Sequence, residues 1–261
     1  SPFPSAADFC SVGPMTLKDK VVVITGASAG IGASLAALLA ERGCKLALIA
    51  RREELLNQIA AKCGAFAIVA ERAQVKRAVA AAIGKYGHVD VWINNAGQGI
   101  SRMPSELTDE DIDAMMQINV KSVLYGMQEI LPHFKERNAG HVINISSLLG
   151  RVPFAIFRSA YCGAKHFMNA LTSTFRVEVH GQYPDIQISL VSPGVVATEF
   201  GVRALGGGVD SRLIPNAQSP EEVAQVIADV ILSRRADAYT RPEYRKTIAD
   251  YYAAEDLDAV E

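Results

Sequence analysis

The chain has 261 residues, 49% of them hydrophobic, which is enough for one large α/β domain or two small ones with a sizeable core. Twenty-six basic residues against 28 acidic ones leave a formal net charge of -2, which excludes a global attraction to nucleic acid or to an anionic membrane. The four cysteines form no CxxC pair and no metal-ligand spacing, so we expect reduced thiols, no metal site and a cytoplasmic location.

The region before Met15 is not expected to belong to the fold. Residues 1–14 precede a possible natural start at Met15 and are expected to be a disordered extension or a cloning remnant. The first basic residue is Lys18 and no apolar run approaches about 18 residues, so neither a charged signal-peptide start nor a membrane span is predicted. Residues 15–261 are expected to form a single domain.

Short apolar runs alternate with longer stretches of helical period from Lys20 onward. The runs are nearly continuous and are bounded by turn residues or charges, which is typical of strands buried on both faces of a parallel sheet. They predict strands at 21–25, 45–50, 65–70, 89–94, 141–146 and 186–191. The other stretches predict helices at 31–42, 52–62, 71–85, 108–136, 159–180 and 220–234. This order predicts one doubly wound, Rossmann-type α/β domain, with a flexible loop at about 199–218 and a polar tail at 235–261.

Polar residues and glycines follow most of the predicted strands. In an open α/β sheet, ligands bind beyond the carboxyl ends of the strands. The segments there are TGASAGIG at 25–32, RRE at 51–53, NAGQG at 95–99, SSLLG at 146–150 and SPGVVATEF at 192–200. A structural scaffold needs turn residues at these places but not this many hydrogen-bonding side chains. The sequence therefore predicts a ligand site at this edge.

Three glycines, Gly26, Gly30 and Gly32, open the first strand-to-helix turn. Glycine lets the backbone turn sharply and approach a phosphate closely, and the free N–H groups at a helix start attract negative charge. The spacing is G-x-x-x-G-x-G and not the commoner G-x-G-x-x-G of dinucleotide sites. The turn predicts a pyrophosphate site; the alternative is a glycine-rich turn needed only for tight packing.

Two arginines, Arg51 and Arg52, come directly after the second strand, where the adenosine ribose of a dinucleotide would lie. An acidic residue there favours NAD, whereas arginine suits the 2′-phosphate of NADP. Position 50 is Ala50, so no acid stands at the end of the strand. NADP(H) is therefore favoured over NAD(H), chiefly through Arg51; the alternative is a basic pair on a solvated helix start.

Several of these motifs occur in the order of one known family. They are TGASAGIG, NNAG at 94–97, Asn119, Ser147, Y-x-x-x-K at 161–165 and PG at 193–194. In this combination the chain resembles the classical short-chain dehydrogenase/reductases from about Lys18 to about Ile231. In that family the helices corresponding to 108–136 and 159–180 form subunit interfaces. Because both carry apolar residues on more than one face here, we expect a homodimer or homotetramer.

The resemblance implies a catalytic role for four residues. Tyr161 is similar to the general acid/base that protonates a carbonyl oxygen. A free phenol has a pKa of about 10, so it needs a nearby positive charge, which Lys165 supplies from four positions further along the same helical face. Ser147, rather than its neighbour Ser146, is similar to the serine that hydrogen-bonds the substrate oxygen. Asn119 is similar to the asparagine that helps to hold a water next to the lysine.

The resemblance also implies a cofactor site in the strand-end loops. Asn95 and Gly97 are similar to the segment beside the adenine ribose, and residues 193–198 to the segment that bonds the nicotinamide amide and the diphosphate. Thr198 is equally compatible with a helix cap. The cofactor-binding residues that we predict are Gly26, Ser28, Gly30, Ile31, Gly32, Arg51, Arg52, Asn95, Ala96, Gly97, Tyr161, Lys165, Pro193, Gly194, Val196 and Thr198.

One segment departs from the family pattern. An aspartate and a short polar turn usually follow the third strand and bond the adenine amine, but here AIVA runs directly into ERAQV, about three residues too soon. Either Glu71 or a backbone carbonyl makes that contact, or the sequence itself omits residues at this place.

The segment between Ser147 and Tyr161 is apolar, with Val152, Pro153, Phe154, Ile156 and Phe157. It predicts a pocket for a hydrophobic carbonyl compound, or else a surface that packs on a neighbouring subunit. In the family, the loop at 199–218 is a substrate lid. The tail either joins the subunit contacts or closes over the site. The predicted function is that of an NADP(H)-dependent carbonyl reductase; the alternative is a non-catalytic nucleotide-sensing or interaction protein.

Overall fold

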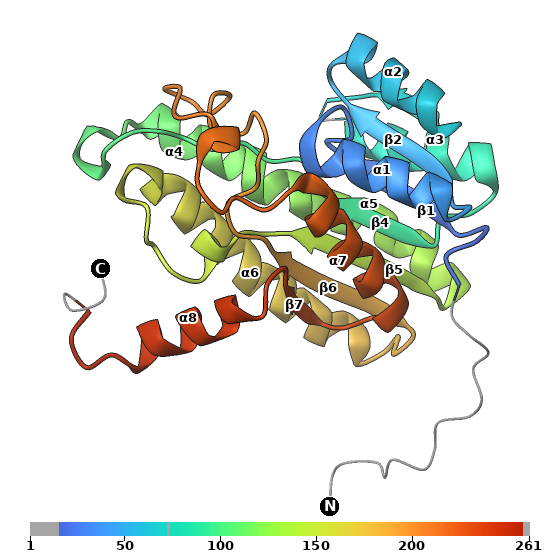
Figure 1. Ribbon diagram of the computed structural model, residues 1–261. Helices are drawn as coiled ribbons and strands as arrows, with labels where there is room; N and C mark the ends of the chain where they lie inside the picture. Colours follow the sequence, from blue (N-terminus) through green and yellow to red (C-terminus); the bar gives the residue numbers. More distant parts are fainter. Residues whose placement is uncertain (1–15, 72–73, 258–261) are drawn as a thin grey trace, which may run out of the picture.

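The computed structural model describes residues 16–71 and 74–257, so the extension expected at 1–14 lies outside the described residues. Seven parallel strands form one sheet in the order β3-β2-β1-β4-β5-β6-β7 (Figure 1). The strands are β1 (Val21–Thr25), β2 (Lys45–Ala50), β3 (Phe66–Val69), β4 (Val91–Asn94), β5 (Gly140–Ile145), β6 (Ile186–Ser192) and β7 (Asp237–Tyr239). The strand order reverses between β1 and β4, which places a ligand crevice there.

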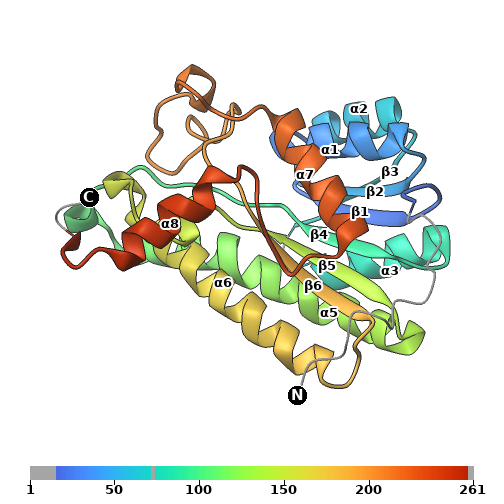
Figure 2. The ribbon, with the colours of Figure 1, turned by 60° about the horizontal axis from the view of Figure 1, so that its bottom comes forward.

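Helices cover both faces of the sheet (Figures 1 and 2). On one face lie α1 (Gly30–Glu41), α2 (Glu53–Cys63) and α7 (Pro220–Ser233). On the other lie α3 (Val75–Tyr86), α5 (Ser122–Arg137) and α6 (Ser159–His180), with α4 (Asp109–Met116) beside α6. None of the helices in the described ranges combines the length and the apolar character needed to cross a membrane. The predicted doubly wound, single-domain α/β fold is confirmed.

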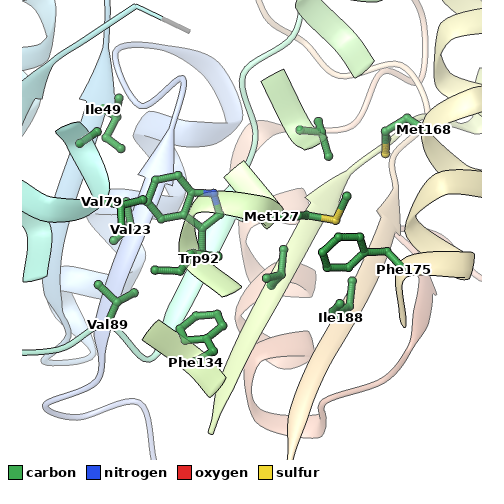
Figure 3. Packing of buried hydrophobic residues seen from close by; sticks show 14 of the residues in the cluster. Val23, Ile49, Val79, Val89, Trp92, Met127, Phe134, Met168, Phe175 and Ile188 are labelled. Atoms are coloured by element: carbon green, nitrogen blue, oxygen red, sulfur yellow. The ribbon is translucent and has the colours of Figure 1, made fainter. Parts of the chain in front are cut away.

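The two hydrophobic cores arise from the alternation of side chains along the strands. In β1, Val21 and Val23 join the core under α3, α5 and α6, whereas Val22 and Ile24 join the core under α1, α2 and α7. Both sets are fully buried, which explains why the strand is apolar throughout. Figure 3 shows the first core, in which Trp92 lies among side chains of the sheet and the helices.

Two parts of the chain differ from the sequence prediction. The helix predicted at 108–136 is broken into α4 and α5 by a π-helical turn at Gln117–Lys121. The segment predicted as a polar tail contains β7 and α8 (Glu243–Ala253). β7 has three residues and is held by pairing with β6, where Ala238 lies beside Val191. A strand this short has no periodic pattern of its own, so its sequence carries little signal.

Candidate active site

The loops that follow β1 and β4 are joined at the carboxyl edge of the sheet. Thr25 Oγ1 accepts hydrogen bonds from the backbone N–H groups of Asn95 (3.0 Å) and Ala96 (3.1 Å). The Asn95 side chain donates to the carbonyl oxygen of Thr25 at 2.9 Å. A Cβ added to Gly26 would lie 2.9 Å from the Cα of Ala96, so only glycine permits this approach. The predicted residues Gly26, Asn95 and Ala96 therefore lie together at the point where the strand order reverses.

The glycine turn fits the diphosphate of a dinucleotide. Gly26 and Gly30 have φ values of 68° and 55°, a region that other residues rarely adopt. A Cβ on Gly32 would lie 2.5 Å from the Gly26 carbonyl oxygen. Helix α1 starts at Gly30 with no capping side chain and no acidic residue in its first turn. Its first N–H groups are thus free of side-chain partners and can bind an anion. Ile31 is half-buried there.

The two predicted phosphate-binding arginines differ in position. Arg52 lies over the glycine turn, where its Nε and Nη2 donate to Ser28 Oγ at 3.2 and 3.0 Å. Its Nη1 is buried and has no hydrogen-bond partner within the described ranges. Burial lowers the pKa of Arg52, and the positive charges of Arg203 and Arg51 lower it further. Arg51 is exposed. The structure therefore places Arg52 at the glycine turn, and the phosphate contact expected chiefly of Arg51 stays a prediction.

Tyr161 and Lys165 lie on one face of α6, and both are buried. Lys165 Nζ lies 5.7 Å from the centre of the Tyr161 ring and donates a hydrogen bond to the carbonyl oxygen of Ile145 at 2.9 Å. A Cβ added to Gly97 would lie 3.8 Å from Lys165 Nζ. The pair therefore faces the loop after β4, as the sequence predicts for residues that meet a cofactor.

Burial controls the protonation of this pair. Burial raises the pKa of Tyr161 well above its ordinary value, while a hydrogen bond with Ser147 and the charge of Arg158 act in the opposite direction. Burial also lowers the pKa of Lys165 to about 8. At neutral pH the phenol is protonated and the ammonium is charged. The arrangement suits a phenol that gives up its proton to a bound oxygen next to a cation.

The two neighbouring serines have different environments. Ser146 Oγ is buried and donates to Asn169 Oδ1 at 2.5 Å. Ser147 Oγ accepts a hydrogen bond from the Leu149 N–H at 3.1 Å, so its own proton can be donated towards Tyr161 or a bound oxygen. The hydrogen bond of Ser147 also lowers the pKa of Tyr161. The geometry favours Ser147 over Ser146 as the residue that meets a substrate.

Asn119 lies within the π-helical turn between α4 and α5. Its Oδ1 accepts from the Gln98 N–H at 3.2 Å, and its Nδ2 donates to the carbonyl oxygens of Gln98 (3.0 Å) and Met115 (3.3 Å). The two bonds with Gln98 hold the loop after β4, and the bond to Met115 joins the amide to α4. A Cβ on Gly97 would lie 3.2 Å from Asn119 Oδ1. The structure thus brings Asn119, Gly97 and Lys165 together, and the Asn119 side chain acts as a clamp on the loop.

The segment after β6 is held by Gln218, a residue that the sequence analysis did not single out. Gln218 is fully buried, and its Oε1 accepts from the Gly194 N–H (3.1 Å) and from Thr240 Oγ1 (2.6 Å). Its main chain bonds Val195 and Ala197 and pairs with Val196. A buried glutamine has no sequence signal, since glutamine is usually exposed.

Pro193 and Thr198 connect this segment to other parts of the site. The Pro193 carbonyl oxygen accepts from the Leu148 N–H at 2.6 Å. Thr198 Oγ1 accepts from the Phe200 N–H at 3.2 Å, and a Cβ on Gly30 would lie 3.1 Å from the Thr198 methyl group. Thr198 therefore caps a turn, since no helix begins there, and also lies against the glycine turn.

The predicted apolar pocket wall lies on the surface instead. Phe154, Ile156 and Phe157 are 44%, 61% and 45% exposed, so they do not form a closed pocket within one chain. Phe154 packs edge-on against Tyr251 of α8, with ring centres 5.4 Å apart. The aromatic ring that does reach the site is Phe200, which meets Tyr161 edge-on at 5.5 Å. Packing on a neighbouring subunit stays open as the alternative for the exposed residues.

Helix α8 lies beside the site, at the end of α6 that carries Tyr161 (Figures 1 and 2). A Cβ on Gly194 would lie 2.2 Å from the Tyr244 hydroxyl, so the tyrosine covers this glycine. The Tyr252 hydroxyl donates to the carbonyl oxygen of Arg151 at 2.7 Å. These contacts place α8 against Gly194 and the segment after β5, and both roles predicted for the tail stay predictions.

The chain directly after the third strand is described up to Glu71. Glu71 is exposed, and its N–H donates to Gln74 Oε1 at 3.0 Å. Residues 72 and 73 lie outside the described residues. An adenine contact through Glu71 or a backbone carbonyl therefore stays a prediction. Within the described ranges, no group of three or more histidine, cysteine or acidic residues could hold a metal ion.

Comparisons with known proteins find relatives of this chain. The short chain dehydrogenase family model matches residues 20–204. An oxidoreductase of Staphylococcus saprophyticus is 35% identical over 221 residues, which cover 81% of this chain and 89% of that protein. A dehydrogenase/reductase SDR family protein 7-like protein of Drosophila melanogaster is 32% identical over 240 residues, covering 85% and 72%.

Solved structures share the fold over nearly the whole chain. A short chain dehydrogenase/reductase from Burkholderia phymatum, in complex with NAD, has a TM-score of 0.83 at 24% identity and covers 95% of this chain and 97% of its own. A 3-ketoacyl-(acyl-carrier-protein) reductase from Brucella melitensis, complexed with NADH, has a TM-score of 0.77 at 26% identity, covering 86% and 97%. Because the Burkholderia phymatum protein is only 24% identical, its likeness to this chain shows the fold alone.

Proposed function

Because the chain belongs to the short-chain dehydrogenase family of oxidoreductases, we propose that it is an NADP(H)-dependent carbonyl reductase that also oxidises the corresponding alcohol. The observation that carries the proposal is the buried pair of Tyr161 and Lys165 beside Ser147, at the edge where the strand order reverses. A protein that only senses nucleotides has no need of a phenol and an ammonium buried together, since burying a charge is costly.

The roles of the residues follow from their positions. When bound, the nicotinamide cofactor supplies or accepts the hydride. In reduction, Tyr161 donates its phenolic proton to the substrate oxygen, and the Ser147 hydroxyl donates a hydrogen bond to the same oxygen. The phenolate left on Tyr161 lies beside the ammonium of Lys165, whose charge stabilises it. The burial of the pair excludes water from the proton transfer.

A panel of carbonyl compounds tests the proposed activity. Ketones, aldehydes and diketones are mixed with the protein and NADPH, and the loss of nicotinamide absorbance is followed. We expect turnover with at least one class, and faster turnover with NADPH than with NADH. A protein that binds NADPH but turns over no member of the panel would instead fit the non-catalytic alternative.

The choice of cofactor is expected to depend on Arg52. Arg52→Ala should raise the KM for NADPH by about 10- to 100-fold, because a charge-assisted contact with the 2′-phosphate is lost, and should change the KM for NADH little. Arg51→Ala is the matched control and should have the smaller effect, since Arg51 is exposed. Steady-state kinetics with both cofactors gives the comparison. Equal losses with NADPH and NADH would contradict the phosphate assignment.

We also propose that the protein works as a homodimer or homotetramer in the cytoplasm. Two residues of α6 support an interface, since Phe167 is 53% and Val177 is 75% exposed. Large apolar side chains that remain exposed on a helix favour contact with a second copy of the chain. Sedimentation of the purified protein measures the assembly.

A further inference from the structure

Arg158 is a buried cation next to the proposed catalytic residues. It lies three residues before Tyr161, at the start of α6, and is 9% exposed. Burial lowers its pKa, and the groups that oppose this shift are Tyr161 and Cys162. No carboxylate forms an ion pair with it within the described ranges. A buried guanidinium without an acidic partner is costly, so its retention calls for a function.

Most of the hydrogen-bonding capacity of Arg158 is unused. Its Nη1 donates to the carbonyl oxygen of Ile100 at 2.8 Å, which is the one hydrogen bond of this side chain within the described ranges. A guanidinium carries five N–H donors. The rings of Phe157 and Phe200 lie 5.3 and 5.9 Å from its central carbon and cover part of its surface. The remaining donors are available to a ligand.

Two glycines let the backbone pass close to this guanidinium without placing a side chain on it. A Cβ on Gly99 would lie 2.6 Å from Arg158 Nη1, and one on Gly208 would lie 3.4 Å from Nη2 and 2.6 Å from Ser101 Oγ. The Ser101 hydroxyl is buried and has no hydrogen-bond partner within the described ranges. Gly208 has a φ of 150° and belongs to the loop at 199–218. A cation and an unpaired hydroxyl thus lie under the same turn of this loop.

Hydrogen bonds hold the loop at 199–218 over Arg158 and Ser101, and the same loop reaches Tyr161. The Ser101 N–H donates to the Leu205 carbonyl oxygen at 2.7 Å, and the Leu205 N–H donates to the Gly99 carbonyl oxygen at 2.9 Å. Phe200, from the same loop, lies against both Arg158 and Tyr161. Whatever binds Arg158 is therefore close to the oxygen that Tyr161 protonates.

We propose that Arg158, together with Ser101, binds a carboxylate of the substrate, so that the preferred substrates are carbonyl compounds that also carry an acid group. This inference rests on the proposed function and names the substrate class of the same site. Arginine pairs with carboxylate through two parallel N–H···O bonds, and these bonds are strong where water is excluded. The serine hydroxyl supplies a further donor to the same anion.

Matched substrates test the inference. An aromatic keto acid and its methyl ester are compared by kcat/KM with NADPH. We expect the wild type to prefer the acid at least about tenfold, and Arg158→Met to lose about 100-fold on the acid. The loss on the ester should be clearly smaller and comes only from the effect of the Arg158 charge on the pKa of Tyr161. Arg158→Lys should recover part of the activity on the acid, because lysine restores the positive charge but not the two parallel N–H···O bonds. Ser101→Ala should lower activity on the acid alone, by about 5- to 10-fold.

A binding measurement keeps the test independent of turnover and of folding. With NADPH at saturation, benzoate should raise the melting temperature of the wild type more than benzamide does. This difference should disappear in Arg158→Met, provided that the variant is folded, and should become smaller in Ser101→Ala. Equal handling of acid and ester, or equal losses on both in the variants, would overturn the inference while the reductase activity stands. Absence of any turnover would overturn the proposed function, and the benzoate shift would then still decide whether Arg158 binds carboxylate.

Discussion

Tyr161→Phe is expected to lower kcat by about 1,000-fold or more and to leave the affinity for NADPH within about threefold of the wild type. The substitution removes the phenolic proton that the proposed mechanism gives to the substrate oxygen beside Lys165 and Ser147. The ring stays, so its edge contact with Phe200 at 5.5 Å is kept. Single-turnover kinetics with NADPH measures the loss, and the fluorescence of the bound cofactor measures affinity.

Tyr86→Phe is the matched control for this prediction. Its hydroxyl donates to the carbonyl oxygen of Leu46 at 2.9 Å, which lies at the opposite end of β2 from the site. Losing that bond should cost about 1 kcal/mol of unfolding free energy and leave kcat unchanged. Near-normal turnover by Tyr161→Phe would refute the proposed mechanism, since no other described residue has been placed to deliver the proton.

Lys165→Met is expected to lower kcat by about 100- to 1,000-fold and, at the same time, to change how stability depends on pH. Burial lowers the pKa of Lys165 from 10.5 to about 8, and Nζ has one carbonyl partner, that of Ile145. Between pH 8 and pH 10.5 the unfolded chain holds a proton on this lysine that the folded chain has released. Wild-type stability therefore gains from this group as the pH rises through that range.

Methionine has a similar length and no proton to bind. The gain in stability of Lys165→Met over the wild type, measured as the difference in the free energy needed for unfolding, should therefore be about 3 kcal/mol larger at pH 7 than at pH 10.5. Urea unfolding at the two pH values measures the difference. Met168, fully buried one turn further along α6, provides a control as Met168→Leu, whose effect should not vary with pH. A pH-independent difference for Lys165→Met would show that the ammonium is not held in an apolar environment.

Sequence reasoning predicted best the bounds of those elements whose pattern of apolar residues lies within one continuous segment. The helix at 159–180 has the bounds of α6 because a helical repeat of buried residues marks it, and the strand at 21–25 has the bounds of β1 because a continuous apolar run marks it. The spacing of Tyr161 and Lys165 is also local, since residues four apart in a helix share a face. The glycine turn is local for the same reason, as Gly26 and Gly30 need a positive φ that few other residues tolerate.

Other features depend on contacts between distant segments. The π-helical turn that carries Asn119 breaks a helix whose amphipathic pattern continues through it. The apolar run that includes Ile156 and Phe157 predicted a pocket wall, but these side chains are exposed, because sequence composition does not tell which face of a loop meets the site. The side chain of Arg52 lies over the glycine turn because it bonds Ser28, a contact that the sequence does not show, and the phosphate assignment to Arg51 or Arg52 stays a prediction.

The sequence alone determined the doubly wound fold, because that fold follows from local periodicity. It predicted the members of the catalytic group through the resemblance of its motifs to a known family. The tertiary structure decided what surrounds that group. Gln218 holds Gly194, α8 covers the same glycine, and Arg158 lies without an acid under the loop at 199–218. Each of these depends on residues many positions apart in the chain. Burial and pairing at such distances depend on how the elements pack, and no local pattern records them.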